Sequence, residues 1–310
     1  NLNLFMLKNI SLSLLSLFML TAFHVSAQQS LPVADLAEIT PLTEVANDPL
    51  QVLLEDEVMK NPTWRRLVNN KKMSIGVVDL NNINNAHYAG INSNEMMYAA
   101  SLPKIAILLA SMDAIENCEL AETVEVTRDL NLMINRSDNH ASTRMIDRLG
   151  YDKIAAVLQS PEYKLYDELN GGGLWVGKRY AAGGPRNPDP IKGLSHAATV
   201  QQVCRFYYKM ITGNLVSPER SKKMLDIMED SHLHHKFVNT LDRIAPNARV
   251  FRKSGSWRNY HADSALVWGK DGRKYILVAL VEDPNGEQII RDLVVPLENI
   301  IKKSRSLETT

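Results

Sequence analysis

Three short motifs in this chain carry the residue types needed to attack an amide carbonyl. In chain order they are Ser101-Leu-Pro-Lys104, Ser137-Asp138-Asn139 and Lys253-Ser254-Gly255. A serine hydroxyl becomes an effective nucleophile when a base removes its proton, and a lysine with a lowered pKa can be that base. Together the motifs predict an enzyme that forms a covalent ester with its substrate.

The first motif falls at the start of an expected helix over residues 101–117. Residues three positions apart share one face of a helix, so Ser101 and Lys104 can point the same way. Pro103 is tolerated there because the first turn of a helix does not need its N–H group. The free N–H groups of a helix N-terminus can also stabilise an oxyanion. The alternative is an ordinary helix start with a surface lysine.

The second and third motifs each have a functional and a structural interpretation. Ser137 can relay a proton to a leaving nitrogen while Asn139 binds a substrate amide, but the same string is typical of a helix cap. Lys253 and Ser254 can bind a substrate carboxylate, and Gly255 allows close approach to the strand. The alternative for the third motif is a polar surface strand.

Strands are expected near both ends of the chain and helices in its middle. The expected strands are residues 73–79, 87–89, 249–252, 262–268 and 274–281. The expected helices are residues 50–59, 101–117, 127–134, 139–149, 200–211, 217–229 and 288–303. This order predicts a mixed α/β fold of the α+β type, with a five-stranded antiparallel sheet flanked by helices. An all-helical lobe over about residues 101–229 is inserted into it.

Composition limits the possible partners of the chain. Its 310 residues are 45% hydrophobic, which is enough for a large core. Lys and Arg together number 35, as do Asp and Glu together, so no basic surface for nucleic acid or anionic lipid is expected. We expect a monomer that binds a small molecule.

The N-terminal segment resembles an export signal. Lys8 precedes an uncharged apolar run over residues 10–23, and Val25-Ser26-Ala27 fits a cleavage site. We therefore expect a signal peptide over 1–27, a linker over 28–48 and one hydrolase domain over 49–310. The mature protein would be periplasmic or secreted, without a stable membrane span. The alternative is an N-terminal anchor, although the apolar run is short for one.

Cysteine and histidine usage predicts no metal site. Cys204 lies in an apolar helical run and is expected to be a buried free thiol, whereas the pairing of Cys118 is left open. No Cys/His set has the spacing of a zinc site. The cluster His232, His234 and His235 follows an acidic helix end, and we expect it on the solvated surface.

The three motifs and their surroundings resemble the class A β-lactamase branch of the penicillin-recognising serine enzymes. The resemblance extends from about Leu50 to the C-terminal helix. It is carried by residues 97–104, 133–141, 212–215, 224–229, 251–255 and 268–272. Ser254 stands where this family commonly has threonine, which preserves the hydroxyl group.

The resemblance implies roles for individual residues, no cofactor, and a β-lactam or a cell-wall peptide as the ligand. The implied catalytic residues are the nucleophile Ser101, the candidate base Lys104 and the proton relay Ser137. The implied substrate contacts are the side chains of Asn139, Lys253 and Ser254 and the oxyanion-hole N–H groups of Ser101 and Ser256.

One family feature is missing from the sequence. The deacylating water is normally held by the Glu of a Glu-x-x-Leu-Asn string, and the corresponding residues here begin with Tyr166. Leu169 and Asn170 match, so Asn170 is an expected substrate contact. An ordinary tyrosine is neutral near pH 7 and is a poor base for water. Asp167 and Glu168 are the alternative bases.

The long loop over residues 161–193, rich in Gly and Pro, is therefore expected to be functional. Three activities remain open from the sequence. The favoured one is β-lactam hydrolysis through an acyl-enzyme on Ser101. The alternatives are a D,D-peptidase that acts on peptidoglycan peptides and a penicillin-binding protein that does not turn over.

Overall fold

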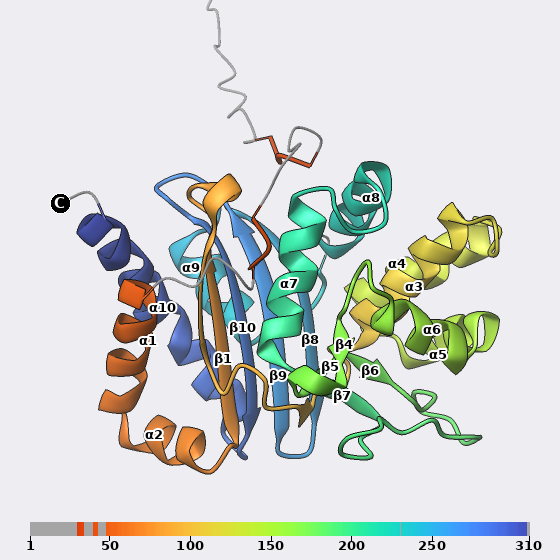
Figure 1. Cartoon of the computed structure of the whole chain (residues 1–310), viewed down its shortest axis with the longest axis horizontal. Helices are drawn as coiled ribbons and strands as arrows, with labels where there is room; N and C mark the ends of the chain where they lie inside the picture. The colour runs from red at the N-terminus through yellow and green to blue at the C-terminus, as the bar shows by residue number, and fades with distance from the viewer. Residues whose placement is uncertain (1–29, 34–39, 43–47, 230, 309–310) are drawn as a thin grey trace, which may run out of the picture.

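The computed structural model describes residues 30–33, 40–42, 48–229 and 231–308. The expected signal peptide over residues 1–27 lies outside the described residues. Figure 1 shows a twisted sheet with helices on both faces and a separate group of helices beyond the strand β8. Within the described residues, no helix combines the length and apolarity needed to cross a membrane.

The central sheet is five-stranded and antiparallel, as the sequence predicts. Its strands run in the order β2-β1-β10-β9-β8, so the two ends of the chain pair through β1 and β10. The bounds are β1 (Met73–Asp79), β2 (His87–Ile91), β8 (Arg249–Trp257), β9 (Tyr260–Trp268) and β10 (Lys274–Glu282). A short helical turn, η2 (Ile83–Asn85), connects β1 to β2. Strand β8 is therefore an edge strand.

Four helices cover one face of the sheet: α1 (Asp48–Lys60), α2 (Pro62–Asn69), α9 (Phe237–Ile244) and α10 (Gly286–Glu308). In α1, Leu50, Leu54 and Val58 are fully buried, which is the four-residue spacing of one helix face. Helices α2 and α9 were not expected from the sequence. Each has only eight residues, too few for a clear periodic pattern.

The other face carries α7 (Val200–Ile211) and the helical lobe. The remaining lobe helices are α3 (Lys104–Glu116), α4 (Val124–Asn135), α5 (Asn139–Leu149), α6 (Tyr151–Gln159) and α8 (Pro218–Glu229). Helix α3 is buried along most of its length and forms the centre of the lobe. Helix α6 was not expected. Gly150, with φ of 78°, separates it from α5.

The segment before the domain packs against it where it is described. Val33 and Leu42 are buried in the main core, and the Tyr208 hydroxyl donates to the Thr40 carbonyl at 3.1 Å. These pieces of the expected linker therefore contact α7.

The long loop after α6 is folded. It contains β4 (Tyr166–Asp167), the helical turn η3 (Glu168–Asn170), β5 (Gly172–Gly173) and β6 (Trp175–Val176). Strand β6 pairs with β7 (His196–Ala198), which pairs in turn with β3 (Met97–Tyr98) just before the first motif. Trp175 and Tyr180 are buried, so their apolar surface fastens the loop to the lobe. The loop thus reaches the first motif through a small sheet.

Candidate active site

Ser101 lies in the turn between β3 and α3, three residues before the first α-helical residue. The helix was expected to begin at Ser101, but residues 101–103 form a turn instead, and α3 begins at Lys104. The preceding Ala100 has φ of 50°, a left-handed conformation that is strained for a residue with a Cβ atom. The Tyr180 hydroxyl donates to the Ala100 carbonyl at 3.1 Å. Ser101 is thereby held partly exposed at the end of a buried helix.

Lys104 is fully buried, and its amine contacts the second motif. Its Nζ donates to the Ser137 carbonyl at 2.6 Å and to Asn139 Oδ1 at 2.9 Å, and it lies 3.3 Å from Ser137 Oγ. Burial lowers the pKa of Lys104 to about 7, and the charge of Asp138 opposes that shift. A large fraction of neutral amine is therefore present near pH 7, as a general base requires.

The second motif is both a helix cap and part of the site. Asp138 Oδ1 accepts from the Ala141 N–H at 2.6 Å, which is the cap interaction of α5. Ser137, with φ of 55°, turns away from the helix, and Asn139 opens it. The helix-cap interpretation is therefore confirmed for Asp138, while Ser137 and Asn139 both contact the Lys104 amine.

The third motif completes the arrangement from the edge strand β8. Lys253 is buried, and its Nζ donates to Ser137 Oγ at 2.9 Å and to the Ser254 carbonyl at 2.7 Å. Burial, followed by the charges of Lys104 and other cations, lowers the pKa of Lys253 well below its usual value. The Ser137 hydroxyl therefore lies between two amines, a geometry suited to passing a proton.

Gly255 brings β8 against the backbone of the first motif. A Cβ atom at this position would lie 2.3 Å from the Ala99 carbonyl oxygen and 2.6 Å from the Ser101 nitrogen, closer than real Cβ atoms approach. Only glycine fits without displacement of one backbone. The edge of β8 therefore runs beside the Ser101 N–H, as an oxyanion hole shared between Ser101 and Ser256 requires.

The histidine cluster differs from the surface expectation at one residue. His232 and His234 are exposed, but His235 is partly buried and its Nε2 lies 3.2 Å from Ser254 Oγ. Burial, with a smaller effect from Arg252, lowers the pKa of His235 to about 4, so its ring is neutral at pH 7. The segment that follows α8 returns to β8, and no local spacing indicates such a contact.

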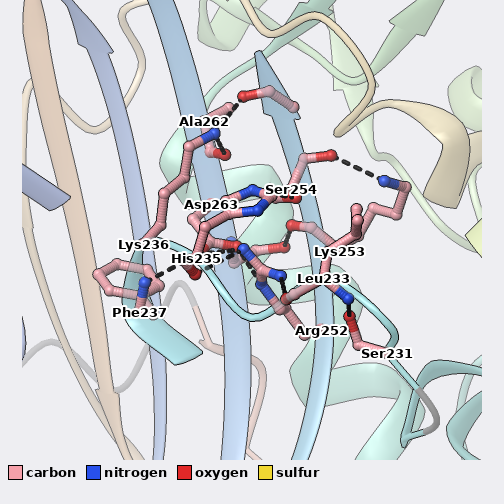
Figure 2. Close-up of polar contacts among 12 residues, drawn as sticks. Ser231, Leu233, His235, Lys236, Phe237, Arg252, Lys253, Ser254, Ala262 and Asp263 are labelled. Atoms are coloured by element: carbon pink, nitrogen blue, oxygen red, sulfur yellow. Dashed lines mark hydrogen bonds and ion pairs between the residues drawn. The ribbon is translucent and has the colours of Figure 1, made fainter. Parts of the chain in front are cut away.

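A buried charge cluster lies next to His235, and the sequence analysis missed it. Arg252 and Asp263 form a two-hydrogen-bond ion pair at 2.9 and 3.0 Å between neighbouring strands. Arg252 also donates to the carbonyls of Leu233 and His235. Figure 2 shows Lys236 beside this pair. The pair fastens the segment over residues 231–236 to the strand that carries the third motif.

The residues expected to serve deacylation, and the expected substrate contact Asn170, make their hydrogen bonds within the long loop over the described part of the chain. Tyr166 is buried, and its hydroxyl donates to Asp189 Oδ1 at 3.2 Å. Asp167 accepts from the Leu169 N–H and from the Asn170 side chain, both within the loop. Glu168 and Asn170 are exposed. Within the described residues, no hydrogen bond or ion pair joins any of them to Lys104 or Ser137, because the β4–β5 hairpin turns η3 toward solvent.

Tyr180, in the long loop, contacts the Lys104 amine. Its buried ring lies under Lys104 Nζ, 4.5 Å from the ring centroid, and packs 4.2 Å from the His196 ring. Among the described residues, no carboxylate hydrogen-bonds to Lys104. The aromatic face of Tyr180 therefore covers one side of the Lys104 amine.

Metal and disulfide chemistry find no support in the described part of the chain. No group of three or more His, Cys, Asp or Glu side chains there is arranged to hold a metal ion. Cys204 is a buried free thiol, which confirms the expectation, and Cys118 is exposed and also free.

Comparisons with known proteins agree with this geometry. A profile of the β-lactamase enzyme family matches residues 63–130 and 121–298. A solved structure of PBP-A shares 18% identity, with a TM-score of 0.60 over 88% of this chain and 100% of that chain. A β-lactamase from Sphaerobacter thermophilus shares 17% identity at a TM-score of 0.60, over 79% of this chain and 95% of that one.

An ancestral class A β-lactamase is similar at 14% identity and a TM-score of 0.59, over 76% of this chain and 98% of that chain. At these identities the likeness establishes the fold alone. No curated protein matches the chain.

Proposed function

The chain belongs to the β-lactamase enzyme family, and we propose that it is a serine hydrolase that opens β-lactam rings by acylating Ser101. The observation that carries the proposal is the convergence of the three motifs. Lys104 and Lys253 both reach the Ser137 hydroxyl, at 3.3 and 2.9 Å, and the N–H of Lys104 donates to the Ser101 carbonyl at 3.2 Å. Such a set offers a nucleophile, a base and a proton relay at one place.

In the proposed acylation step, neutral Lys104 accepts the Ser101 proton while Oγ attacks the carbonyl carbon of the substrate. The negative charge that develops on the carbonyl oxygen is bound by the N–H groups of Ser101 and Ser256. The carbon–nitrogen bond then breaks, and the nitrogen receives a proton from Ser137. The protonated Lys104 amine returns that proton to Ser137, so the step leaves an ester on Ser101 and a neutral relay.

Substrate binding in this proposal uses the remaining polar groups. Lys253 and the Ser254 hydroxyl bind the carboxylate that both β-lactams and cell-wall peptides carry, and the Asn139 amide binds the side-chain amide. The neutral His235 ring next to Ser254 orients that hydroxyl. No step requires a cofactor.

Release of the acyl group is proposed to be slow. Hydrolysis of the ester needs a base that activates water, and a carboxylate is the usual one in this family. Tyr180 presents only a ring face to Lys104, and the hydroxyl of Tyr166 is tied to Asp189. We therefore expect a long-lived acyl-enzyme.

The same observation favours a second candidate, a D,D-peptidase that acts on peptidoglycan peptides. Cleavage of a terminal D-Ala needs the acylation residues but not the carboxylate that lets β-lactamases release penicillin quickly. A solved structure of similar fold is an acyl-enzyme complex of a PBP-A mutant with penicillin G, at 20% identity. It supports the proposal that proteins of this fold are acylated by penicillin.

Intact-protein mass spectrometry tests the proposal directly. Wild-type protein incubated with penicillin G should gain the mass of one drug molecule, and the Ser101→Ala variant should gain none. If the wild type gains no mass, steady hydrolysis of a chromogenic cephalosporin must be measured next. Absence of both adduct and turnover would refute the proposal. Release of D-Ala from peptides ending in D-Ala-D-Ala would establish the second candidate.

Export and the monomeric state remain part of this proposal. The composition of residues 8–27 supports a periplasmic or secreted location, where cell-wall peptides and β-lactams occur. N-terminal sequencing of the mature protein should begin near Gln28. A mature chain that retains residues 1–27 would contradict export by a cleaved signal.

A further inference from the structure

We propose that Lys236 is a positioning residue of the oxyanion hole, holding and polarising the peptide group between Gly255 and Ser256. The inference rests on the proposed function, because that function assigns the N–H of this peptide to the substrate carbonyl. Lys236 is not part of any of the three motifs. It lies at the start of α9, on the segment that returns to β8 (Figure 2).

The Lys236 amine donates all of its hydrogen bonds to groups of the protein. The side chain is completely buried, and Nζ donates to the Gly255 carbonyl at 2.5 Å, the Ser256 hydroxyl at 2.7 Å and the Ala262 carbonyl at 3.0 Å. A lysine ammonium has three hydrogens and here meets three acceptors. None remains for a substrate carboxylate, so direct substrate binding is not the role that the geometry indicates.

The Gly255 carbonyl and the Ser256 N–H belong to one peptide group. In a trans peptide these two bonds point in opposite directions, so a cation on the carbonyl side leaves the N–H directed away from it. The positive charge draws electron density toward the carbonyl oxygen and makes the N–H a stronger donor, as in other chains of polarised hydrogen bonds. This is the donor that the developing oxyanion requires.

Lys236 also holds the peptide in place. Strand β8 is an edge strand with a neighbour on only one side, and Lys236 joins its Gly255 carbonyl to the Ala262 carbonyl of β9. The next residue, Phe237, donates its N–H to Asp263 Oδ2 at 3.1 Å, so Asp263 anchors this segment as well as Arg252. The amine therefore acts on a peptide whose position is set from both strands.

The charges around Lys236 are consistent with an amine that is protonated at neutral pH. Burial, with a smaller effect from Arg252, lowers the pKa of Lys236 to about 8, and the charges of Asp263 and Glu287 oppose the shift. His261 from β9 also interacts electrostatically with it. The amine is thus predominantly protonated at neutral pH although it is enclosed by protein.

Infrared spectroscopy of the acyl-enzyme tests this role, using penicillin G labelled with carbon-13 at the β-lactam carbonyl. In Lys236→Met, the ester carbonyl band should move to higher wavenumber, because its hydrogen bond to Ser256 weakens. Acylation should slow by about ten-fold, less than the loss of an entire oxyanion donor. Lys222→Met, which removes an exposed lysine paired only with Asp226, is the matched control and should change neither quantity.

The Lys236→Gln variant keeps an N–H donor without the charge and should give an intermediate band position. This variant replaces Lys236→Met in the test if Lys236→Met does not fold. Melting curves will show whether Lys236→Met is folded. A Gln variant, or a folded Met variant, with the wild-type band and acylation rate would overturn the inference. If wild-type protein neither forms a Ser101 adduct nor hydrolyses a chromogenic cephalosporin, the proposed function fails instead, so the two failures are distinguishable.

Discussion

The acylation residues and the long loop over residues 161–193 approach Lys104 from different parts of the molecule and are built differently. Ser101, Ser137 and Lys253 lie at the ends of regular elements or on an edge strand, within short motifs. The loop reaches the same amine through Tyr180, which lies in none of the three motifs and in no helix. The residues proposed for acylation match the family motifs closely. The loop residues at the expected deacylation position do not.

This difference separates two chemical steps. Formation of the ester needs a nucleophile, a base and a proton relay. In the proposal these are Ser101, Lys104 and Ser137, of which Lys104 hydrogen-bonds to both of the others. Release of the ester needs a second base, and the loop contributes an aromatic ring. A protein can therefore keep one half of the chemistry while its loop alters the other.

The largest expected effect is on the acylation half. Ser101→Ala removes the nucleophile, and acylation by penicillin G should fall on the order of 10⁶-fold, the scale seen when a catalytic serine is removed. Intact-protein mass spectrometry should then find only the unmodified mass. If this variant formed an adduct at the wild-type rate, the nucleophile would be another residue. The contrast between the acylation residues and the loop would then no longer hold.

Next in size is the loss of the base. In the wild type, the acylation rate should rise between about pH 6 and pH 8, because Lys104 becomes neutral as the pH passes its pKa of about 7. Lys104→Met should be slower by about 10²–10⁴-fold and should lose that rise. Stopped-flow rates with a chromogenic cephalosporin measure both. A pH profile unchanged in the variant would assign the base to another group.

The Tyr180→Glu variant tests whether the loop limits release of the acyl group, because it puts a carboxylate beside Lys104. Because this carboxylate can activate water, the Ser101 adduct should decay about ten-fold faster or more, within the range of general-base catalysis. Tyr180→Phe keeps the ring and is the matched control. Mass spectrometry measures the lifetime of the adduct in the wild type and in both variants. Equal lifetimes in these three proteins would show that the loop does not limit release of the acyl group.

The smallest expected effect is at Tyr166, where the sequence match had placed the missing Glu. Tyr166→Phe removes one buried hydrogen bond to Asp189, which should lower the unfolding free energy by about 1 kcal/mol. The adduct lifetime should not change, since the Tyr166 hydroxyl is bonded to Asp189 and, among the described residues, Tyr166 does not hydrogen-bond to Lys104. Urea denaturation gives the first quantity. A changed lifetime would mean that the sequence match, and not the position of Tyr180, identifies the deacylation region.

Much of the fold follows from local patterns. The alternation and apolar runs of β1, β9 and β10 and the periodicity of α1 and α7 predict their type correctly, because each element buries one face or both. Helices α2, α6 and α9 were missed because they are short. The turn over residues 101–103 shortened the expected α3, although Pro103 and the motif itself were placed at the right junction.

The residues of the candidate site were predicted from the sequence less completely than the fold. The motif residues Ser101, Lys104 and Ser137 were found because they lie close in sequence or in recognisable strings. His235 and Lys236 were not, since their partners Ser254 and Gly255 lie 19 positions away and the contact depends on the path of the segment after α8. Glu168 and Asn170 were expected at the site, but the β4–β5 hairpin exposes both.

The sequence by itself determined which groups can carry out acyl transfer and that strands from both ends form one sheet, because these properties depend on residue type and short-range periodicity. Only the tertiary structure decided which loop residue meets Lys104 and which cation lies behind the Gly255–Ser256 peptide. Both are contacts between segments remote in the chain, and such contacts are selected by how buried surfaces pack together rather than by any local spacing.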